Sequence, residues 1–509
     1  MTEIHWSSQS AYPLLFWLQV FPALGAVLVW RLGDRPLALL IGRVWASLGL
    51  LLAIALYQKI DPGSAALQMS ERVSGLGYHV AADGITALFV LVGAFIVFLT
   101  ALYGMVRGFA HSGRLLATVL AVEAALMVNL VTVNLLWFAA ASAAELMLIG
   151  YLIAHWSTST EENRSLAMAR FLQFQTFGWL LLVAGFIIVA WNYADATYGQ
   201  WSFDLTELAG HPPPGKFQAV AFFLMFYGLA VRTPLFPLHG WLPPVAHRGT
   251  VAVAPGLLLG VKVGIYGIIR YVLPLTPQAV LDWQYFVVGF AMFGVFFTAV
   301  LAFLQTNLRR LLSFAVVSHT SLIVIGLFTL HPIGIQGAVM LSVNFGLAVT
   351  VMLFMVGFVF RRTGTTDLDR LGGLFERIPF LSFVFFVGGL SVIGMPGTPG
   401  FDAAHLVLEA AIARFGALPT IATALGNVVA AGFLLWAFQR SFLAPPTGEA
   451  KAIERTLPME IAVASIALTA LLVTGFYTEP WLHLTDAATQ AIGTAFGHAP
   501  GHTPGHGGH

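Results

Sequence analysis

Long runs of apolar residues follow one another along this chain, with only short polar or proline-containing stretches between them. A run of about 20 apolar residues can cross a bilayer as an α-helix, and about fourteen such runs are present. The predicted spans are 11–31, 36–57, 83–106, 113–133, 134–156, 170–193, 216–236, 250–270, 284–304, 308–330, 334–360, 378–394 continuing as 400–415, 417–439 and 459–477. The pattern therefore predicts an all-α polytopic membrane protein, with one membrane domain over residues 1–509.

Two of these predicted helices, the seventh and the twelfth, are interrupted. The first breaks around Pro234, Pro237 and Gly240, and the second breaks in the stretch GMPGTPG at 394–400. Broken helices at corresponding places in two halves of a chain are typical of inverted repeats in transporters. We expect three helices at 11–106, five-helix repeats at 113–270 and 284–439, a final helix at 459–477 and a disordered His/Gly/Pro tail at 490–509.

Composition supports a membrane protein and excludes several kinds of chemistry. The chain is 58% hydrophobic and 9% charged, whereas soluble domains are about 25% charged. A net charge of +1 gives no reason to expect a nucleic-acid partner, and the absence of cysteine excludes thiolate metal sites and iron–sulfur clusters. There is also no phosphate-binding glycine loop, zinc spacing or nucleophile elbow, so we expect no cofactor, no metal and no catalytic site.

The distribution of basic residues predicts the orientation. If the loops alternate between the two sides, one side holds most of the 24 lysines and arginines, while the other holds only Lys59, Arg72, Lys216, Arg270 and Arg414. Basic loops stay on the cytoplasmic side of a membrane. We therefore expect both termini on the non-cytoplasmic side of a bacterial plasma membrane.

Lys262 is the most informative residue of the chain. It is the single charged residue in the apolar run AVAPGLLLGVKVGIYGII at 252–269. An ammonium group at the centre of a bilayer costs at least a few kcal/mol, so it should face the protein interior or a hydrated cavity. The stretch before it carries Arg232 and His239 and is broken by prolines, which is how membrane proteins build ion pathways.

Further ionisable residues fall within the predicted spans, and stepwise proton transfer through a membrane needs groups of this kind. Together with Lys262, the candidate proton pathway comprises Glu123, Glu145, Arg232, His239, His319, Asp402 and His405. Asp402, His405 and Glu409 are spaced so that they share one face of a helix.

Structural explanations are the alternative for several of these residues. Glu145 and Arg232 could form a static ion pair between two helices. His319 could serve only as a hydrogen-bonding residue between helices. Glu409, near a helix end, could simply be solvated.

Seven segments of the chain resemble the antiporter-like membrane subunits of respiratory complex I, and the subunit M branch is the most similar. The similar segments are YHVAADGI (78–85), PLFPLHGWLP (234–243), KVGIYGIIRY (262–271), NLRRLLSFAVVSHTSL (307–322), RRTGTTDLDRLGGL (361–374), GMPGTPGF (394–401) and LLWAFQRSF (434–442). The resemblance implies a fourteen-helix fold with two inverted five-helix repeats and a proton channel along a central charged axis. It also implies that NADH and quinone are handled by other subunits.

Residue by residue, the resemblance places Glu123, Glu145, Lys262 and His319 at charged or titratable positions of the family. Other positions depart from the family pattern. Arg232 stands where the family has a lysine, and Phe345 stands where it has a histidine. Ala404 replaces the exit glutamate, and Asp402 and His405 on either side of it are the candidate substitutes. These departures also fit a divergent paralogue.

The sequence therefore predicts a proton-translocating membrane subunit of an NADH–quinone oxidoreductase-like complex, a translocase subunit without a redox centre of its own. Its expected partners are other membrane subunits and the lipid bilayer. The alternative is a proton-coupling subunit of a cation/proton antiporter, a membrane hydrogenase or an inorganic-carbon uptake complex. A third reading is a structural paralogue that no longer conducts.

Overall fold

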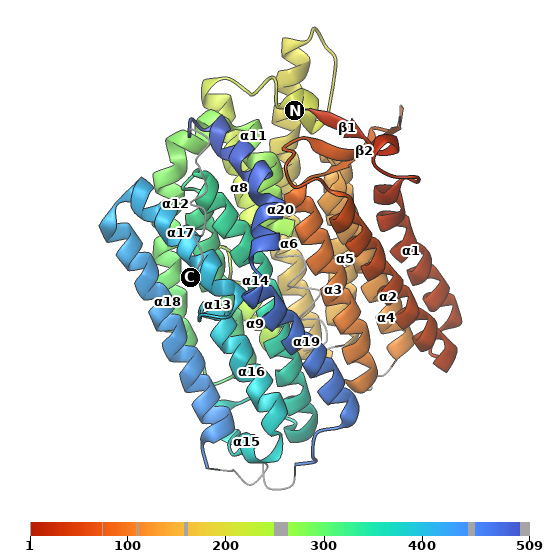
Figure 1. The fold of residues 1–509 in the computed structure, drawn as a ribbon, viewed down its shortest axis with the longest axis vertical. Helices are drawn as coiled ribbons and strands as arrows, with labels where there is room; N and C mark the ends of the chain where they lie inside the picture. Colours follow the sequence, from red (N-terminus) through yellow and green to blue (C-terminus); the bar gives the residue numbers. More distant parts are fainter. Residues whose placement is uncertain are drawn as a thin grey trace.

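The computed structural model of the chain describes residues 2–73, 75–107, 109, 111–156, 161–248, 263–445 and 453–498. Its longer helices are α1 (Leu14–Leu32), α2 (Pro36–Lys59), α3 (Gly84–Arg107), α4 (Ser112–Val131), α5 (Leu135–His155), α6 (Glu161–Ala196), α8 (Gly215–Arg232), α12 (Pro277–Phe303), α13 (Leu308–Leu327), α14 (Pro332–Thr363), α16 (Pro379–Val392), α17 (Pro399–Phe415), α18 (Ala417–Phe438), α19 (Pro458–Phe476) and α20 (Glu479–Ala495). Figure 1 shows them packed side by side as an elongated bundle.

Short turns of helix connect or extend these rods. They are η1 (Trp6–Ser8), α7 (Leu205–Leu208), α9 (Leu242–Arg248), the π-helical turn η2 (Ile268–Val272), α11 (Leu273–Leu275), η3 (Leu368–Arg370), α15 (Leu374–Arg377) and the π-helical turn η4 (Gln439–Leu443). In the described part of the chain, eleven helices are long and apolar enough to span a membrane. The prediction of a polytopic helical membrane protein is confirmed, while the count of fourteen and the inverted repeats stay predictions.

Burial separates central helices from peripheral ones. In the most apolar stretch of each helix, 94% of the residues are buried in α13 and 89% in α14, against 28% in both α2 and α19. A helix that is apolar all round and buried all round belongs to the interior of a bundle, whereas the exposed apolar faces of α2 and α19 suit lipid. Polar side chains in the middle of these two helices, such as Ser318, His319 and Asn344, are therefore buried inside the bundle.

A small sheet caps the end of the bundle where the chain begins (Figure 1). Strand β2 (Leu67–Val73) pairs in parallel with β1 (Glu3–His5) and antiparallel with β3 (Tyr78–Ala82). The carboxylate of Glu71 on β2 accepts hydrogen bonds from the Leu15 and Phe16 amides at the start of α1, which fixes the sheet to the bundle. The connection between the predicted spans 36–57 and 83–106 therefore contains regular structure, in which the strands satisfy one another's backbone groups.

The two predicted breaks lie where the prolines indicate. Helix α8 ends at Arg232 and α9 begins at Leu242, with Pro234 and Pro237 between them. Similarly, α16 ends at Val392 and α17 begins at Pro399. Proline lacks the amide hydrogen that continues a helix, so each break leaves backbone groups and polar side chains inside the bundle.

The largest differences from the predicted spans are in α6, in α12 and at the C-terminal end. Helix α6 runs over Glu161–Ala196, well beyond the predicted 170–193, and α12 begins at Pro277 rather than at 284. Helix α20 was not predicted, and it ends at Ala495, so the first residues of the expected disordered tail are helical. One side of α20 packs on α3 and α14: Leu484 contacts Gly84, and Pro332 contacts Gly493. Helix α20 contains polar as well as apolar residues, so it does not form one of the uniformly apolar runs on which the predicted spans are based.

Candidate functional site

Glu145 and Arg232 form an ion pair in the interior of the bundle. Glu145 on α5 is fully buried and Arg232, the last residue of α8, is 6% exposed. The Arg232 Nη2 atom donates to Glu145 Oε2. Its Nη1 atom donates to the Ser142 hydroxyl at 2.7 Å. The proline-containing segment ends α8 at Arg232, so the guanidinium lies at a helix end inside the bundle.

Two neutral side chains close this pair into a ring. Asn129 of α4 donates from Nδ2 to Glu145 Oε2 at 2.7 Å and accepts from the Ser142 hydroxyl at 3.1 Å. Ser142 in turn accepts from Arg232. The other carboxylate oxygen, Glu145 Oε1, has no hydrogen-bond partner among the described residues. The ring therefore fixes one oxygen of the carboxylate and leaves the second without a hydrogen bond from the described residues.

Glu123 is a second buried carboxyl group, in the middle of α4. It is 2% exposed, and its Oε2 atom has no hydrogen-bond partner within the described segments. Gly49 of α2 makes room for it, since a Cβ at that position would lie 3.3 Å from Glu123 Oε1. A buried carboxyl group without a counter-ion stays neutral or is neutralised by a passing proton.

His239 lies in the break between α8 and α9, half-buried. Its ring stacks on Phe236, with centroids 5.7 Å apart, and meets Phe314 of α13 edge-on at 6.1 Å. The Nδ1 atom is buried and has no hydrogen-bond partner among the described residues. The irregular segment thus brings an unpaired imidazole nitrogen against α13.

His319 lies on α13 and is 2% exposed. Its Nδ1–H donates to the Ala315 carbonyl, one turn earlier, at 3.0 Å. The ring also stacks on Phe345 of α14. The structure therefore buries this histidine in the central helix pair without an acidic partner of its own among the described residues.

Lys262 lies outside the described residues, so its predicted role stays a prediction. The first described residues after it belong to a helical segment that packs closely on the end of α8. A Cβ added at Gly264 would come within 2.7 Å of the Thr233 side chain, next to Arg232.

Asp402 and His405 lie on α17, away from the buried ring. Asp402 is partly exposed and accepts a hydrogen bond from the Thr478 hydroxyl at 2.6 Å. His405 and Glu409 are exposed, because α17 turns Ala403, Ala404 and Val407 inward instead. The three titratable residues do share one helix face, as their spacing predicts, but it is the outer face of the chain.

Sequence reasoning missed a second buried ion pair. Arg270 in the π-helical turn donates from Nη2 to Asp83 Oδ2 at 2.7 Å and to the Thr86 hydroxyl at 2.9 Å. The Tyr266 hydroxyl accepts from Arg270 Nε at 3.2 Å and donates to the Leu130 carbonyl at 2.5 Å. We had assigned Arg270 to an aqueous loop region because it ends an apolar run. Only the fold brings it to Asp83.

The sheet end of the molecule carries another unexpected cluster, outside the membrane-spanning helices. His79, which is 1% exposed, contacts Asp204 Oδ2 through Nδ1 at 2.6 Å and Glu3 Oε2 through Nε2 at 3.3 Å. Burial alone would raise the pKa of Asp204, but hydrogen bonds from His79 and Thr206 outweigh burial and hold that pKa below its usual value. This cluster joins β1, β3 and the start of α7.

The comparisons with known proteins agree on one group. Residues 133–430 match the family described as "NADH:quinone oxidoreductase/Mrp antiporter, TM". NADH-quinone oxidoreductase subunit M of Mycobacterium tuberculosis is 28% identical over 94% of this chain and 93% of its own length.

Solved structures of similar fold include chains from respiratory complex I and from an Mrp complex. A chain of respiratory complex I from Thermus thermophilus superposes with a TM-score of 0.84 at 25% identity, covering 95% of this chain and 100% of the other. A chain of the Mrp complex from Dietzia sp. has a TM-score of 0.83 at 18% identity, over 95% of this chain and 99% of the other, which supports the fold alone.

Proposed function

Because the chain belongs to the NADH:quinone oxidoreductase/Mrp antiporter transmembrane family, we propose that it is the proton-translocating membrane subunit of an NADH–quinone oxidoreductase-like complex. Two relatives named NADH-quinone oxidoreductase subunit M are similar to this chain over almost their full length. In this proposal, the neighbouring subunits supply the redox chemistry and this chain supplies a path for protons.

The observation that carries the proposal is the ring around Glu145. A carboxylate at hydrocarbon depth is costly unless it is paired, and here Arg232, Ser142 and Asn129 hold one of its oxygens. A purely structural pair would satisfy the second oxygen as well, as Asp83 does with Arg270 and the Thr86 amide. Among the described residues Glu145 Oε1 has no hydrogen-bond partner, which supports a change of protonation state at this ion pair.

Around this ring we propose a route of titratable groups. We call the side of the bundle that holds most of the arginines the arginine-rich face. Protons reach Glu123 and the Glu145–Arg232 pair from this face. They then pass Lys262, His239 and His319, and they leave near Asp402 and His405. The arginine-rich face would be cytoplasmic, with both termini on the other side of a bacterial inner membrane. Arg232 is effectively always protonated, so it acts by its field on Glu145 rather than by carrying the proton.

A second function is open to the same machinery. The family description includes the Mrp antiporters, so a proton-coupling subunit of a cation/proton antiporter is the alternative. In that case, the same groups would exchange protons against a metal cation moved by the complex. The two functions differ in whether NADH or quinone turnover depends on this chain.

The test uses the native complex purified with this chain and reconstituted into liposomes. Glu145→Gln and, separately, Lys262→Ala should abolish coupled proton movement while the complex still assembles. Glu460→Gln is the matched control, because Glu460 is also fully buried but is paired through both oxygens with Arg362. Unchanged proton movement in both Glu145→Gln and Lys262→Ala would refute the proposal. Loss of sodium-driven exchange without any effect on quinone turnover would favour the antiporter.

A further inference from the structure

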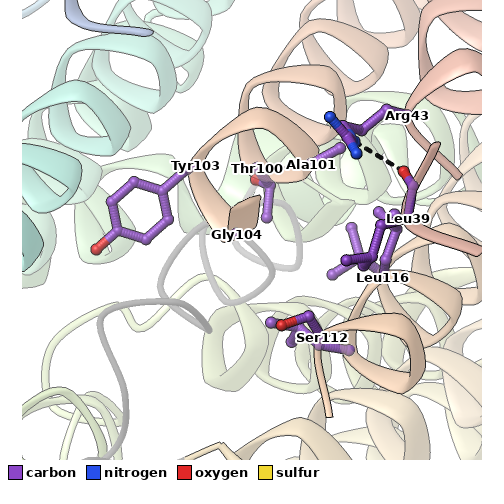
Figure 2. A pocket seen from close by; sticks show the side chains of 10 residues that line it. Leu39, Arg43, Thr100, Ala101, Tyr103, Gly104, Ser112 and Leu116 are labelled. Carbon is purple, nitrogen blue, oxygen red and sulfur yellow. Dashed lines mark hydrogen bonds between the residues drawn. The ribbon is translucent and has the colours of Figure 1, made fainter. Parts of the chain in front are cut away.

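A small cavity lies between α2, α3 and α4, at the end of the bundle that carries Arg31, Arg35 and Arg114. Figure 2 shows it from close by, with Arg43 of α2, Thr100 of α3 and Ser112 of α4 among the side chains around it. Its volume is about 20 Å³, which is room for one water molecule. None of the groups described for the proton route above lines it.

The polar groups of the cavity wall suit a bound water. The Arg43 Nε atom donates to the carbonyl of Leu39, four residues earlier in α2, at 2.8 Å (dashed line in Figure 2). The hydroxyls of Thr100 and Ser112 donate to the Ile96 and Phe109 carbonyls, so their oxygens can accept hydrogen bonds from a water. Two hydroxyl acceptors are the minimum of the two to four partners that a buried water needs, and the Arg43 guanidinium adds positive charge at the same wall.

The cavity lies on the same side of α4 as Glu123. Val119 and Leu116, which line it, precede Glu123 by four and seven residues and therefore share its helix face. Along the helix axis they lie about 6 Å and about 10 Å from Glu123. On α2, Gly49 lies against the Glu123 carboxyl group, since a Cβ there would be 3.3 Å from Oε1. A cavity large enough for one water thus precedes, along the seam between α2 and α4, a buried acid whose Oε2 atom has no hydrogen-bond partner in the described part of the chain.

We propose that this seam between α2 and α4 is a proton-access route from the arginine-rich face to Glu123, and that the cavity holds a water molecule on that route. A hydronium ion that reaches the cavity transfers its proton across the seam to the Glu123 carboxylate, which leaves a neutral water and a neutral carboxylic acid. Leu116 and Val119 close the last turn of the route in this structure, so transfer requires water to enter between them. This inference rests on the proposed proton translocation, but the cysteine labelling that tests the hydrated cavity does not depend on it.

The test exploits the fact that the chain contains no cysteine. Single cysteines are placed at Val119, which lines the cavity, and at Leu120, its fully buried neighbour, which does not. Membranes holding the native complex are treated with a charged methanethiosulfonate from the arginine-rich side. Only an ionised thiol reacts, and a thiol ionises where water reaches it. We expect Val119→Cys to react at least tenfold faster than Leu120→Cys, and the near-isosteric Thr100→Val to slow the Val119→Cys reaction.

Equal reaction rates at the two cysteines would overturn the route, whatever the complex transports. A fast reaction at Val119→Cys combined with unchanged proton movement in Glu123→Gln would also overturn it, because the water would then lead to a group that carries no proton. Glu123→Asp, which keeps the carboxyl group, should retain more proton movement than Glu123→Gln. If neither Glu145→Gln nor Lys262→Ala changes proton movement while the cysteine labelling holds, the proposed function fails and the hydrated cavity stands.

Discussion

The imidazole ring of His319 lies almost flat on the phenyl ring of Phe345, with centroids 4.7 Å apart and ring planes 14° apart. The two residues come from α13 and α14, the most buried helices of the bundle. Phe345 occupies the position at which the resemblance to complex I subunits leads one to expect a histidine. Where two titratable rings are expected, this chain therefore has one titratable ring and one apolar ring in face-to-face contact.

Substitutions at this stacked pair should distinguish a role of His319 in proton transfer from a role in packing. We expect His319→Phe to keep the stack but to lower coupled proton movement at least about tenfold, because the relay loses its imidazole. Phe345→His should keep assembly and should not lower the rate. Proton movement in liposomes holding the native complex measures both effects. Equal loss in the two variants would mean that the pair matters only for packing.

Arg232→Lys should be tolerated. A lysine at this position has one nitrogen and cannot contact Glu145 and Ser142 through two separate nitrogens, as Arg232 does. It can, however, give up its proton, so we expect proton movement at the parental rate or faster. Arg232→Met should abolish proton movement and lower the stability by about 3–5 kcal/mol, because it leaves Glu145 buried without a counter-ion. Thermal unfolding of the purified complex and proton movement are the two measurements. Full activity in Arg232→Met would contradict the assigned role.

The Asp83–Arg270 pair should behave as a structural clamp. Removing one partner, as in Asp83→Leu or Arg270→Met, should cost about 3–5 kcal/mol of stability. The double change should cost less than the sum of the two single changes, since it leaves no charge unpaired. Thermal unfolding in detergent gives this cycle directly. Additive losses would show that the two side chains do not interact energetically.

Glu71 should make the stability depend on pH near neutrality. Burial raises its pKa to about 7, against 4.5 for an ordinary glutamate, although the Leu15 and Phe16 amides oppose the rise. The folded state thus holds the proton more tightly than the unfolded state. The associated stability is complete below pH 4.5 and is lost as the pH rises through about 7, by on the order of 1–2 kcal/mol after solvent screening. Glu71→Gln should flatten this slope of unfolding temperature against pH. A slope that persists in the variant would assign the pH dependence to other groups.

The proposed exit can be tested at α17. Asp402→Asn combined with His405→Ala should block proton release and lower coupled proton movement, if these residues replace the exit glutamate that Ala404 lacks. Glu409→Gln, on the same helix face and farther from the break, is the matched control. A double variant that moves protons at the parental rate would remove the exit from α17.

Much of the fold could be predicted because bilayer helices must be uniformly apolar and about 20 residues long. The breaks after Arg232 and before Pro399 could be predicted because proline cannot continue a helix. The sheet and α20 were missed for the opposite reason. Strands β1 and β2 pair across some 60 residues of sequence, and α20 buries only one side, so neither has a local apolar signal.

The site was predictable at the level of single residues and not at the level of pairs. Glu145 and Arg232 were singled out because charge is costly in lipid, and the fold brings them together. Asn129 and Ser142 carry no charge and were overlooked, although they close the ring. His405 was expected inside, because its helical spacing with Asp402 fixes a shared face but does not say which way that face turns.

That outward face of α17 determines how the chain can exist in a cell. Hydrocarbon tails offer no hydrogen bonds to the His405 imidazole or the Asp402 carboxylate, so bare lipid is a poor neighbour for this wall. Made without its sister subunits, the chain would draw water and headgroups toward the wall and thin the bilayer around it. We therefore expect the isolated chain to be degraded as a misfolded membrane protein, unless it is synthesised together with the subunits that cover this face.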